Sequence, residues 1–273
     1  MKKMIISILC IIIGLVAMAQ GKVSTRKYIL SDFQDKVTKI VVPQDPILAS
    51  ALRQEVVNSW SVSAFEFCTE QEFESIGDTD EFYFLALRAF KFKGEQEPGI
   101  IFMSLLKGQS HEVISLPLAP ADDSSGRELV FIGALVKAIQ DYTLAAMESE
   151  KTAYIPSTWF NANFEKWGRM MTIFMAREDL SVSVTDEDTG KYLDTDFHIC
   201  SADEADEKFV QAPVNTLVSY SVSPVDPSAG SYSYQLLFKA DTMELFYISR
   251  HKIKSNAMAG FLVKDLKWLA GKR

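Results

Sequence analysis

The chain has 273 residues, with 28 Lys and Arg against 36 Asp and Glu, and 48% of its residues are hydrophobic. This composition is typical of a folded globular protein and excludes a disordered, collagen-like or short-repeat chain. The net charge of -8 argues against a nucleic-acid partner, because phosphate binding depends mainly on Lys and Arg.

The segment 1–19 has the pattern of an export signal. Lys2 and Lys3 precede an apolar run over 4–16, and small residues at 17 and 19 fit the requirement of signal peptidase. We therefore predict cleavage before Gln20 and a location in the periplasm or at the outer membrane of a Gram-negative bacterium. An uncleaved anchor is the alternative, although the run is shorter than the roughly 20 residues that span a bilayer. No transmembrane segment is expected after cleavage.

The remaining chain is predicted to contain one α/β unit used twice. A short extension, 20–37, leads to the first unit at 38–147, and the second unit occupies 169–273. The connector, 148–168, contains two Trp and two Phe residues and is therefore too apolar for a solvated linker. We expect it to pack between or across the two lobes.

The first unit is predicted to have the order β-α-β-α-β-β-β-α. A strand at 39–42 precedes a helix with Asp45 as its N-cap, and a second strand, 64–69, leads into the second helix. A capping box of Ser125 and Glu128 opens the closing helix. The three consecutive strands before it are expected at 82–92, 99–106 and 111–118.

The second unit repeats this order with a weaker first helix. A strand at 171–174 precedes a short helix capped by Thr185 and Asp188, and the next strand is expected at 196–201. The closing helix is predicted over 256–270. The three consecutive strands are expected at 216–223, 231–239 and 244–253.

The two units align when Cys68 is matched with Cys200. Each of these cysteines ends a strand, and Thr69 and Ser201 follow them as predicted N-caps. The fold class is therefore α/β (α+β), with two tandem units of mixed sheet and packed helices. One continuous α/β domain, or a β-rich second half, remains as an alternative.

Cys68 and Cys200 are the cysteines left after cleavage, in an oxidising compartment that permits one disulfide between them. We favour two separately buried thiols, because the duplication places the cysteines in different lobes.

The motifs of common reactions are missing from this sequence. The three histidines form no H-x-x-x-H pair, C-x-x-C is absent, and no Gly-rich phosphate loop occurs, so neither a metal nor a cofactor is expected. His198 and Cys200 share one face of a strand, which suggests a nucleophile pair. That strand is predicted to be central and buried, where a reactive thiolate is unfavourable.

Charge is distributed unevenly over the second unit. The segment 186–207 is rich in acids and is interpreted as a solvated surface rather than a calcium loop, because the ligand spacing is wrong. The C-terminal segment, 250–273, is rich in Lys and Arg and has Asp265 as its single acid. This basic segment is expected to bind an envelope protein or an anionic membrane surface. The candidate binding residues are Arg250, His251 and Lys252, together with His198 and Cys200 from the earlier strand. Alternatively, the basic segment complements the acidic segment of its own lobe.

Four stretches of the sequence resemble uncharacterised exported proteins of Bacteroidota. They are the signal that ends in Ala-Met-Ala-Gln and residues 45–60, 65–69 and 239–247. This resemblance implies export but no activity. Each unit is also similar in element order to the N-terminal domain of TolB, which is an analogy of fold alone.

These observations predict a non-catalytic binding or assembly module of the cell envelope, with an unidentified ligand. The alternative is a periplasmic hydrolase that uses dispersed carboxylates or Ser and Tyr. An enzyme should bring titratable groups with shifted pKa values into one pocket, whereas a binding module should expose an apolar or basic patch.

Overall fold

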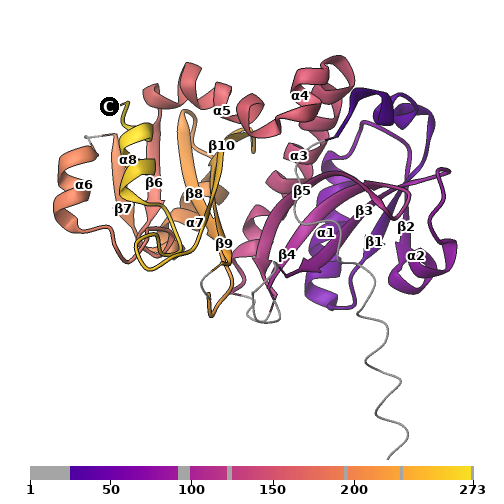
Figure 1. The fold of residues 1–273 in the computed structure, drawn as a ribbon, viewed down its shortest axis with the longest axis horizontal. Helices are drawn as coiled ribbons and strands as arrows, with labels where there is room; N and C mark the ends of the chain where they lie inside the picture. The colour runs from indigo at the N-terminus through magenta and orange to yellow at the C-terminus, as the bar shows by residue number, and fades with distance from the viewer. Residues whose placement is uncertain (1–24, 92–98, 122–124, 194–195, 228–229, 272–273) are drawn as a thin grey trace, which may run out of the picture.

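The computed structural model describes residues 25–91, 99–121, 125–193, 196–227 and 230–271, so the predicted signal peptide lies outside the described residues. Two five-stranded mixed sheets lie side by side, each with its own helices, and we call them the first and second lobes (Figure 1). The predicted α/β class with two similar sheet units is confirmed.

The first lobe begins with two 3-10 helices and has the strand order β2-β1-β3-β4-β5. Its 3-10 helices span Lys27–Leu30 and Phe33–Asp35, and its other elements are β1 (Thr38–Val42), α1 (Pro46–Ser59), β2 (Phe65–Thr69), α2 (Glu70–Ile76), β3 (Tyr83–Phe90), β4 (Ile100–Lys107), β5 (His111–Pro120) and α3 (Arg127–Glu148).

The second lobe follows the connector and has the strand order β10-β9-β8-β6-β7. The connector and this lobe contain α4 (Glu150–Tyr154), α5 (Pro156–Trp167), β6 (Thr172–Ala176), α6 (Asp186–Tyr192), β7 (Phe197–Cys200), α7 (Ala202–Gln211), β8 (Thr216–Val222), β9 (Tyr232–Lys239), β10 (Leu245–Lys252) and α8 (Val263–Leu269), with 3-10 turns at Gly168–Met170 and Arg177–Asp179.

Both sheets have the same connectivity. β1 pairs in parallel with β2 and β3, and β6 pairs in parallel with β7 and β8, because a helix separates these strands along the chain. The last three strands of each lobe are antiparallel neighbours joined by turns. The predicted element order is therefore confirmed in both lobes, and the predicted strand ends lie close to the observed ones.

Helix starts follow the local sequence in most places. Asp45 accepts a hydrogen bond from the backbone N–H of Leu48 at 2.8 Å, and Pro46 occupies the first turn of α1. Thr185 and Asp188 form the predicted capping box of α6. The box predicted at Ser125 is wrong: α3 starts after a left-handed Gly126 without a side-chain cap.

The helix predicted over 256–270 begins about two turns late, at Val263. Gly260 has a φ of +94° and passes so close to the 3-10 turn that a Cβ atom there would lie 2.6 Å from the carbonyl oxygen of Asp179. The chain before α8 is therefore held as a loop against the turn, which prevents a longer helix.

One apolar core runs through both lobes. Its buried side chains come from the facing sides of the two sheets and from α1, α3 and α7, and it includes Leu85, Phe131, Phe209 and Phe238. Phe131 of α3 stacks on Tyr220 of β8 with ring centroids 4.4 Å apart, so α3 closes the first lobe and packs on the second (Figure 1). The two units therefore share a core rather than forming independent domains.

The register of the duplication differs from the cysteine alignment. Ile40 of β1 pairs with β3, and Phe174 of β6 pairs with β8 at the corresponding place, so these two residues are equivalent. The cysteine alignment would instead match Ile40 with Thr172. In the observed register Ile199, and not Cys200, is equivalent to Cys68.

This shift changes the surroundings of the second cysteine. Cys68 packs on the outer face of its sheet, whereas Cys200 packs against the central core. Because side chains alternate along a strand, a change of one position moves Cys200 to the opposite face.

The connector forms α4 and α5, and α5 lies along β10 at the edge of the second sheet (Figure 1). Asn161 of α5 donates to the carbonyl oxygen of Ile248 at 3.1 Å and accepts from its N–H at 2.8 Å. Phe160 enters the central core and Phe164 enters the outer cluster of the second lobe. Phe160 and Phe164 thus pack on opposite faces of this edge, whereas Trp167 stays half exposed.

Among the described residues, α3 alone is long and apolar enough to meet the length and composition of a membrane span. The most apolar part of α3 is 67% buried inside the fold, as is usual for a core helix.

Candidate functional site

A cluster of largely buried charges lies where α3 meets the second lobe. The Arg127 guanidinium donates to Asp179 at 2.9 Å and to Asp206 at 2.9 and 3.0 Å. Asp179 also accepts from the Ser219 hydroxyl at 2.6 Å and from the Ser221 N–H at 3.0 Å. We call Arg127, Asp179 and Asp206 the interlobe cluster.

The interlobe cluster has the properties of a structural joint. Although burial alone would lower the pKa of Arg127, the two carboxylates raise it above its usual value, so the guanidinium stays charged. Its charge lies 5.4 Å from the centre of the Tyr220 ring. Because Asp179 is 2% exposed and its oxygens are already hydrogen-bonded, the cluster offers no free group to a substrate.

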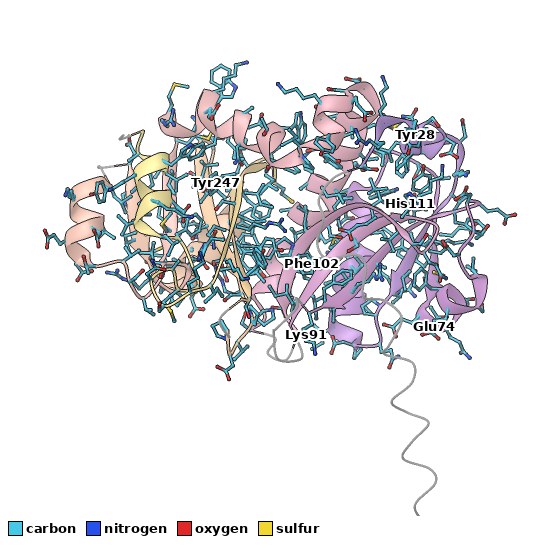
Figure 2. The ribbon with its side chains drawn as sticks, viewed as in Figure 1. Tyr28, Glu74, Lys91, Phe102, His111 and Tyr247 are labelled. Atoms are coloured by element: carbon cyan, nitrogen blue, oxygen red, sulfur yellow. The ribbon has the colours of Figure 1, made fainter. Side chains whose placement is uncertain are left out.

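A second group of polar side chains lies under the start of α8. Tyr247 of β10 donates to Asp265 at 3.4 Å, and the backbone N–H of Leu262 donates to the same carboxylate at 2.8 Å. Burial raises the pKa of Asp265 and of Tyr247. Figure 2 shows Tyr247 inside the second lobe, far from His111 in the first lobe.

His251 lies at the other end of this group and is 8% exposed. Its Nε2 lies 2.8 Å from the carbonyl oxygen of Met258, so this nitrogen is the donor and carries a proton. Its Nδ1 is buried and has no hydrogen-bond partner among the described residues. A buried imidazole nitrogen without a partner is unfavourable.

A pocket of about 600 Å³ opens beside His251 and is lined by lysines. Lys252 and Lys254 come from the end of β10 and the loop after it, and Lys264 comes from the first turn of α8. We call this cavity, which Ser183 and Asn256 also line, the basic pocket. Within the described part of the chain, none of its three lysines has a carboxylate within ion-pair distance.

A neighbouring pocket of about 450 Å³ lies between α5 and α8 and shares Lys264 with the basic pocket. Tyr247, Asp265 and Glu165 line it. Two of these groups have shifted pKa values, but both are buried, and the Asp265 oxygens already accept bonds from Tyr247 and from the backbone. The carboxylate thereby caps α8 from inside the fold.

The five candidate binding residues from the sequence lie at three different places in the structure. His251 and Lys252 meet in the basic pocket. Arg250 is exposed and lies over the Tyr232 ring at 5.2 Å. His198 and Cys200 lie on β7, which is the edge strand of its sheet, so the prediction of a central, buried strand is wrong. The strand order was missed because the pairing of β6 with both neighbours depends on tertiary contacts.

The geometry of β7 does not activate Cys200. His198 is exposed and stacks on Phe174 with ring centroids 5.0 Å apart. Burial, together with the nearby Glu204 and Glu178, raises the pKa of Cys200 to about 11, so its thiol is protonated at neutral pH. Cys68 and Cys200 are free thiols in different sheets.

Sequence reasoning missed Lys254, Lys264 and Asp265, which surround the candidate residues. The dense Lys and Arg content of 250–273 was the available signal, but it did not show which lysines converge. Over the described ranges, no three His, Cys, Asp or Glu side chains gather in a way that would hold a metal ion. No protein family, curated protein or solved structure matches this chain.

Proposed function

We propose that the protein is an exported, non-catalytic binding module of the cell envelope that recognises an anionic group in the basic pocket. The observation that carries this proposal is the convergence of three lysines, unpaired among the described residues, on a pocket lined by His251. Asp265 interacts electrostatically with Lys264 and His251, but three lysines outnumber this one buried carboxylate and create a positive potential that an anionic ligand neutralises. The export signal expected from residues 1–19 supports the envelope location.

Two features of the pocket wall support recognition of phosphate or carboxylate oxygens. The lysine ammonium groups supply mobile, charged donors at the rim of the pocket. Ser183 and Asn256 add neutral hydrogen-bonding groups. The candidate partners are a phosphorylated or acidic envelope molecule and an anionic lipid headgroup.

The test uses pyrophosphate as a probe, with the chain from Gln20 observed by calorimetry. We expect saturable binding that weakens with salt, because the interaction is mainly electrostatic. The triple variant Lys252→Ala, Lys254→Ala, Lys264→Ala should lose it. A control variant with the same net charge, Lys27→Ala, Lys151→Ala, Lys191→Ala, should retain it.

One further outcome would identify the partner, and another would overturn the proposal. Sedimentation with phosphatidylglycerol vesicles, but not with phosphatidylcholine vesicles, would identify a lipid headgroup. Equal pyrophosphate affinity in both triple variants would overturn the proposal, since binding would then not depend on the basic pocket.

The second candidate function is hydrolysis, and the pocket shared by Tyr247 and Asp265 favours it. A hydrolase would cleave chromogenic ester or glycoside substrates, and Asp265→Asn would abolish cleavage while Glu165→Gln changed it less. The binding proposal expects no turnover by the wild-type chain, because the Asp265 carboxylate is engaged by the fold.

A further inference from the structure

A second unassigned cavity lies at the opposite end of the second sheet, where β10 begins. It has a volume of about 550 Å³ and is lined by the end of α5, the turn after it, and residues at or next to the ends of four strands, β6, β8, β9 and β10. Trp167, Met170 and Phe246 provide its apolar wall, and Asn163 and Asn215 provide neutral polar groups. We call this cavity the tryptophan pocket. It shares no lining residue with the basic pocket.

The apolar wall is exposed to solvent to an unusual degree. Trp167 is 48% exposed and Met170 is 67% exposed. Lys166 lies 4.9 Å from the centre of the Trp167 ring without covering the indole. Large apolar side chains that gather at a concave site with a polar rim are typical of a ligand surface.

The two charged residues of the tryptophan pocket each make a polar contact with a neighbouring side chain, whereas its two Asn side chains make none among the described residues. Lys239 is paired with Asp241 at 3.1 Å, and Glu244 accepts a hydrogen bond from Thr242 at 2.7 Å. The side-chain amides of Asn163 and Asn215 have no hydrogen-bond partner within the described part of the chain. The pocket therefore offers two amides as donors and acceptors, beside a Glu244 carboxylate that accepts from the Thr242 hydroxyl.

Asn215 is held at the pocket by the backbone. Its φ of +55° is a left-handed conformation that Asn tolerates better than most residues, and its carbonyl oxygen accepts from the N–H of Thr172 at 3.0 Å. The bond fixes the segment before β8 against the start of β6, so the amide is presented by a rigid scaffold rather than by a free loop.

From these observations we infer that the tryptophan pocket binds a neutral saccharide unit. A sugar ring has an apolar C–H face that packs on an indole, and hydroxyl groups around its edge that exchange hydrogen bonds with amides. The pocket supplies both kinds of surface, and its volume lies in the range of small-molecule sites. An apolar peptide side chain would use the indole but would leave the two amides without matched partners.

The test follows the indole N–H signals of the ¹⁵N-labelled chain from Gln20 while maltotriose, cellotriose or chitotriose is added. Trp167 reports the tryptophan pocket, Trp268 reports the neighbouring pocket between α5 and α8, and Trp60 reports the first lobe. We expect a saturable shift of the Trp167 signal with at least one sugar, while the Trp60 signal stays unchanged.

Two variants examine the wall directly. Trp167→Ala should weaken sugar binding by roughly tenfold or more, measured by calorimetry. Asn215→Gly keeps the left-handed backbone but removes the amide, so it should weaken binding while the fold is retained. Lys252→Ala with Lys254→Ala should leave sugar binding unchanged, which separates this inference from the proposed anion site.

Three results would overturn the inference. The first is no Trp167 shift with any of the three sugars, and the second is unchanged affinity in Trp167→Ala. The third is a Trp167 shift caused by N-acetyl-phenylalaninamide but by none of the sugars, which would identify a peptide site instead.

Discussion

The two lobes have the same strand order, yet their outer faces differ. In the first lobe a small cluster around Val41, Phe84 and Leu106 lies under α2. In the second lobe the outer face carries a larger cluster that includes residues from α5 and α8. The basic pocket, the tryptophan pocket and the pocket between α5 and α8 all lie in the second lobe. The three pockets discussed above are therefore lined by the second lobe and the connector, where the outer face carries the larger apolar cluster.

The largest expected effect tests whether the lobes are one folding unit. Phe131→Ala removes a fully buried ring that stacks on Tyr220 and packs near Phe209 and Phe238. We expect the free energy of unfolding to fall by about 3–5 kcal/mol, with one urea transition for both lobes. Circular dichroism and tryptophan fluorescence should report the same midpoint.

The matched control for this variant is Phe73→Ala, which changes a ring in the small outer cluster of the first lobe. It should cost less, because Phe73 is only partly buried. Two separate transitions in the Phe131→Ala variant would contradict a shared core.

The next effect concerns the interlobe cluster. Arg127→Ala leaves Asp179 and Asp206 without their buried partner, so we expect a loss of about 3 kcal/mol in urea unfolding. Arg177→Ala removes an exposed ion pair with Asp186 and should cost at most about 1 kcal/mol. Similar losses in both variants would show that the cluster does not join the lobes.

A smaller effect compares the two helix caps that the sequence predicted as equivalent. Thr69 and Glu72 form a reciprocal box, with bonds of 2.7 and 3.1 Å, whereas Ser201 makes only the bond from the Glu204 N–H at 3.2 Å. Thr69→Ala should therefore cost about 1 kcal/mol and Ser201→Ala about half as much. Hydrogen exchange in α2 and α7 measures each loss locally, and Thr69→Ser, which keeps the hydroxyl, should restore protection in α2.

The smallest effect is a pH dependence confined to the first lobe. Burial alone would raise the pKa of Asp32, but hydrogen bonds from Lys36, Lys107 and Tyr83 outweigh it and hold this pKa well below its usual value. Because the pKa is lower in the folded state, Asp32 stabilises the fold above the unfolded value of about 4, and this contribution is lost as the pH falls.

We therefore expect Asp32→Asn to lower the urea midpoint at about pH 6, and the difference from the wild type to narrow steadily as the pH falls below about 4. Asp35→Asn, which changes an exposed carboxylate nearby, serves as the control. A pH-independent difference between Asp32→Asn and the wild type would show that the carboxylate charge is not responsible.

Local patterns in the sequence predicted most of the elements. Asp45, Thr69 and Thr185 stand where the helices begin, because a cap needs only residues within one turn. The face of Cys200 and the late start of α8 were not predictable in this way. The first depends on strand register across the sheet, and the second on the close approach of Gly260 to a turn that lies far earlier in the chain.

The candidate site was predicted only in part for a related reason. A basic run along the chain shows composition, and it identified His251 and Lys252, but the pocket also needs Lys264 from α8 and Ser183 from a loop. No pattern of neighbouring residues in the sequence indicated the tryptophan pocket. Its wall combines Trp167, Asn215 and Phe246, which come together because β6, β8 and β10 start at the same end of the sheet, with β9 between β8 and β10.

The amide of Asn161 has a consequence for assembly. It occupies both hydrogen-bonding groups of Ile248 on the outermost strand, in the way that an added strand would. A strand from another chain therefore cannot form these two hydrogen bonds with β10, which disfavours extension of the sheet into a fibre at this edge. Any partner that binds by adding a strand to this sheet must do so at β7, the opposite margin.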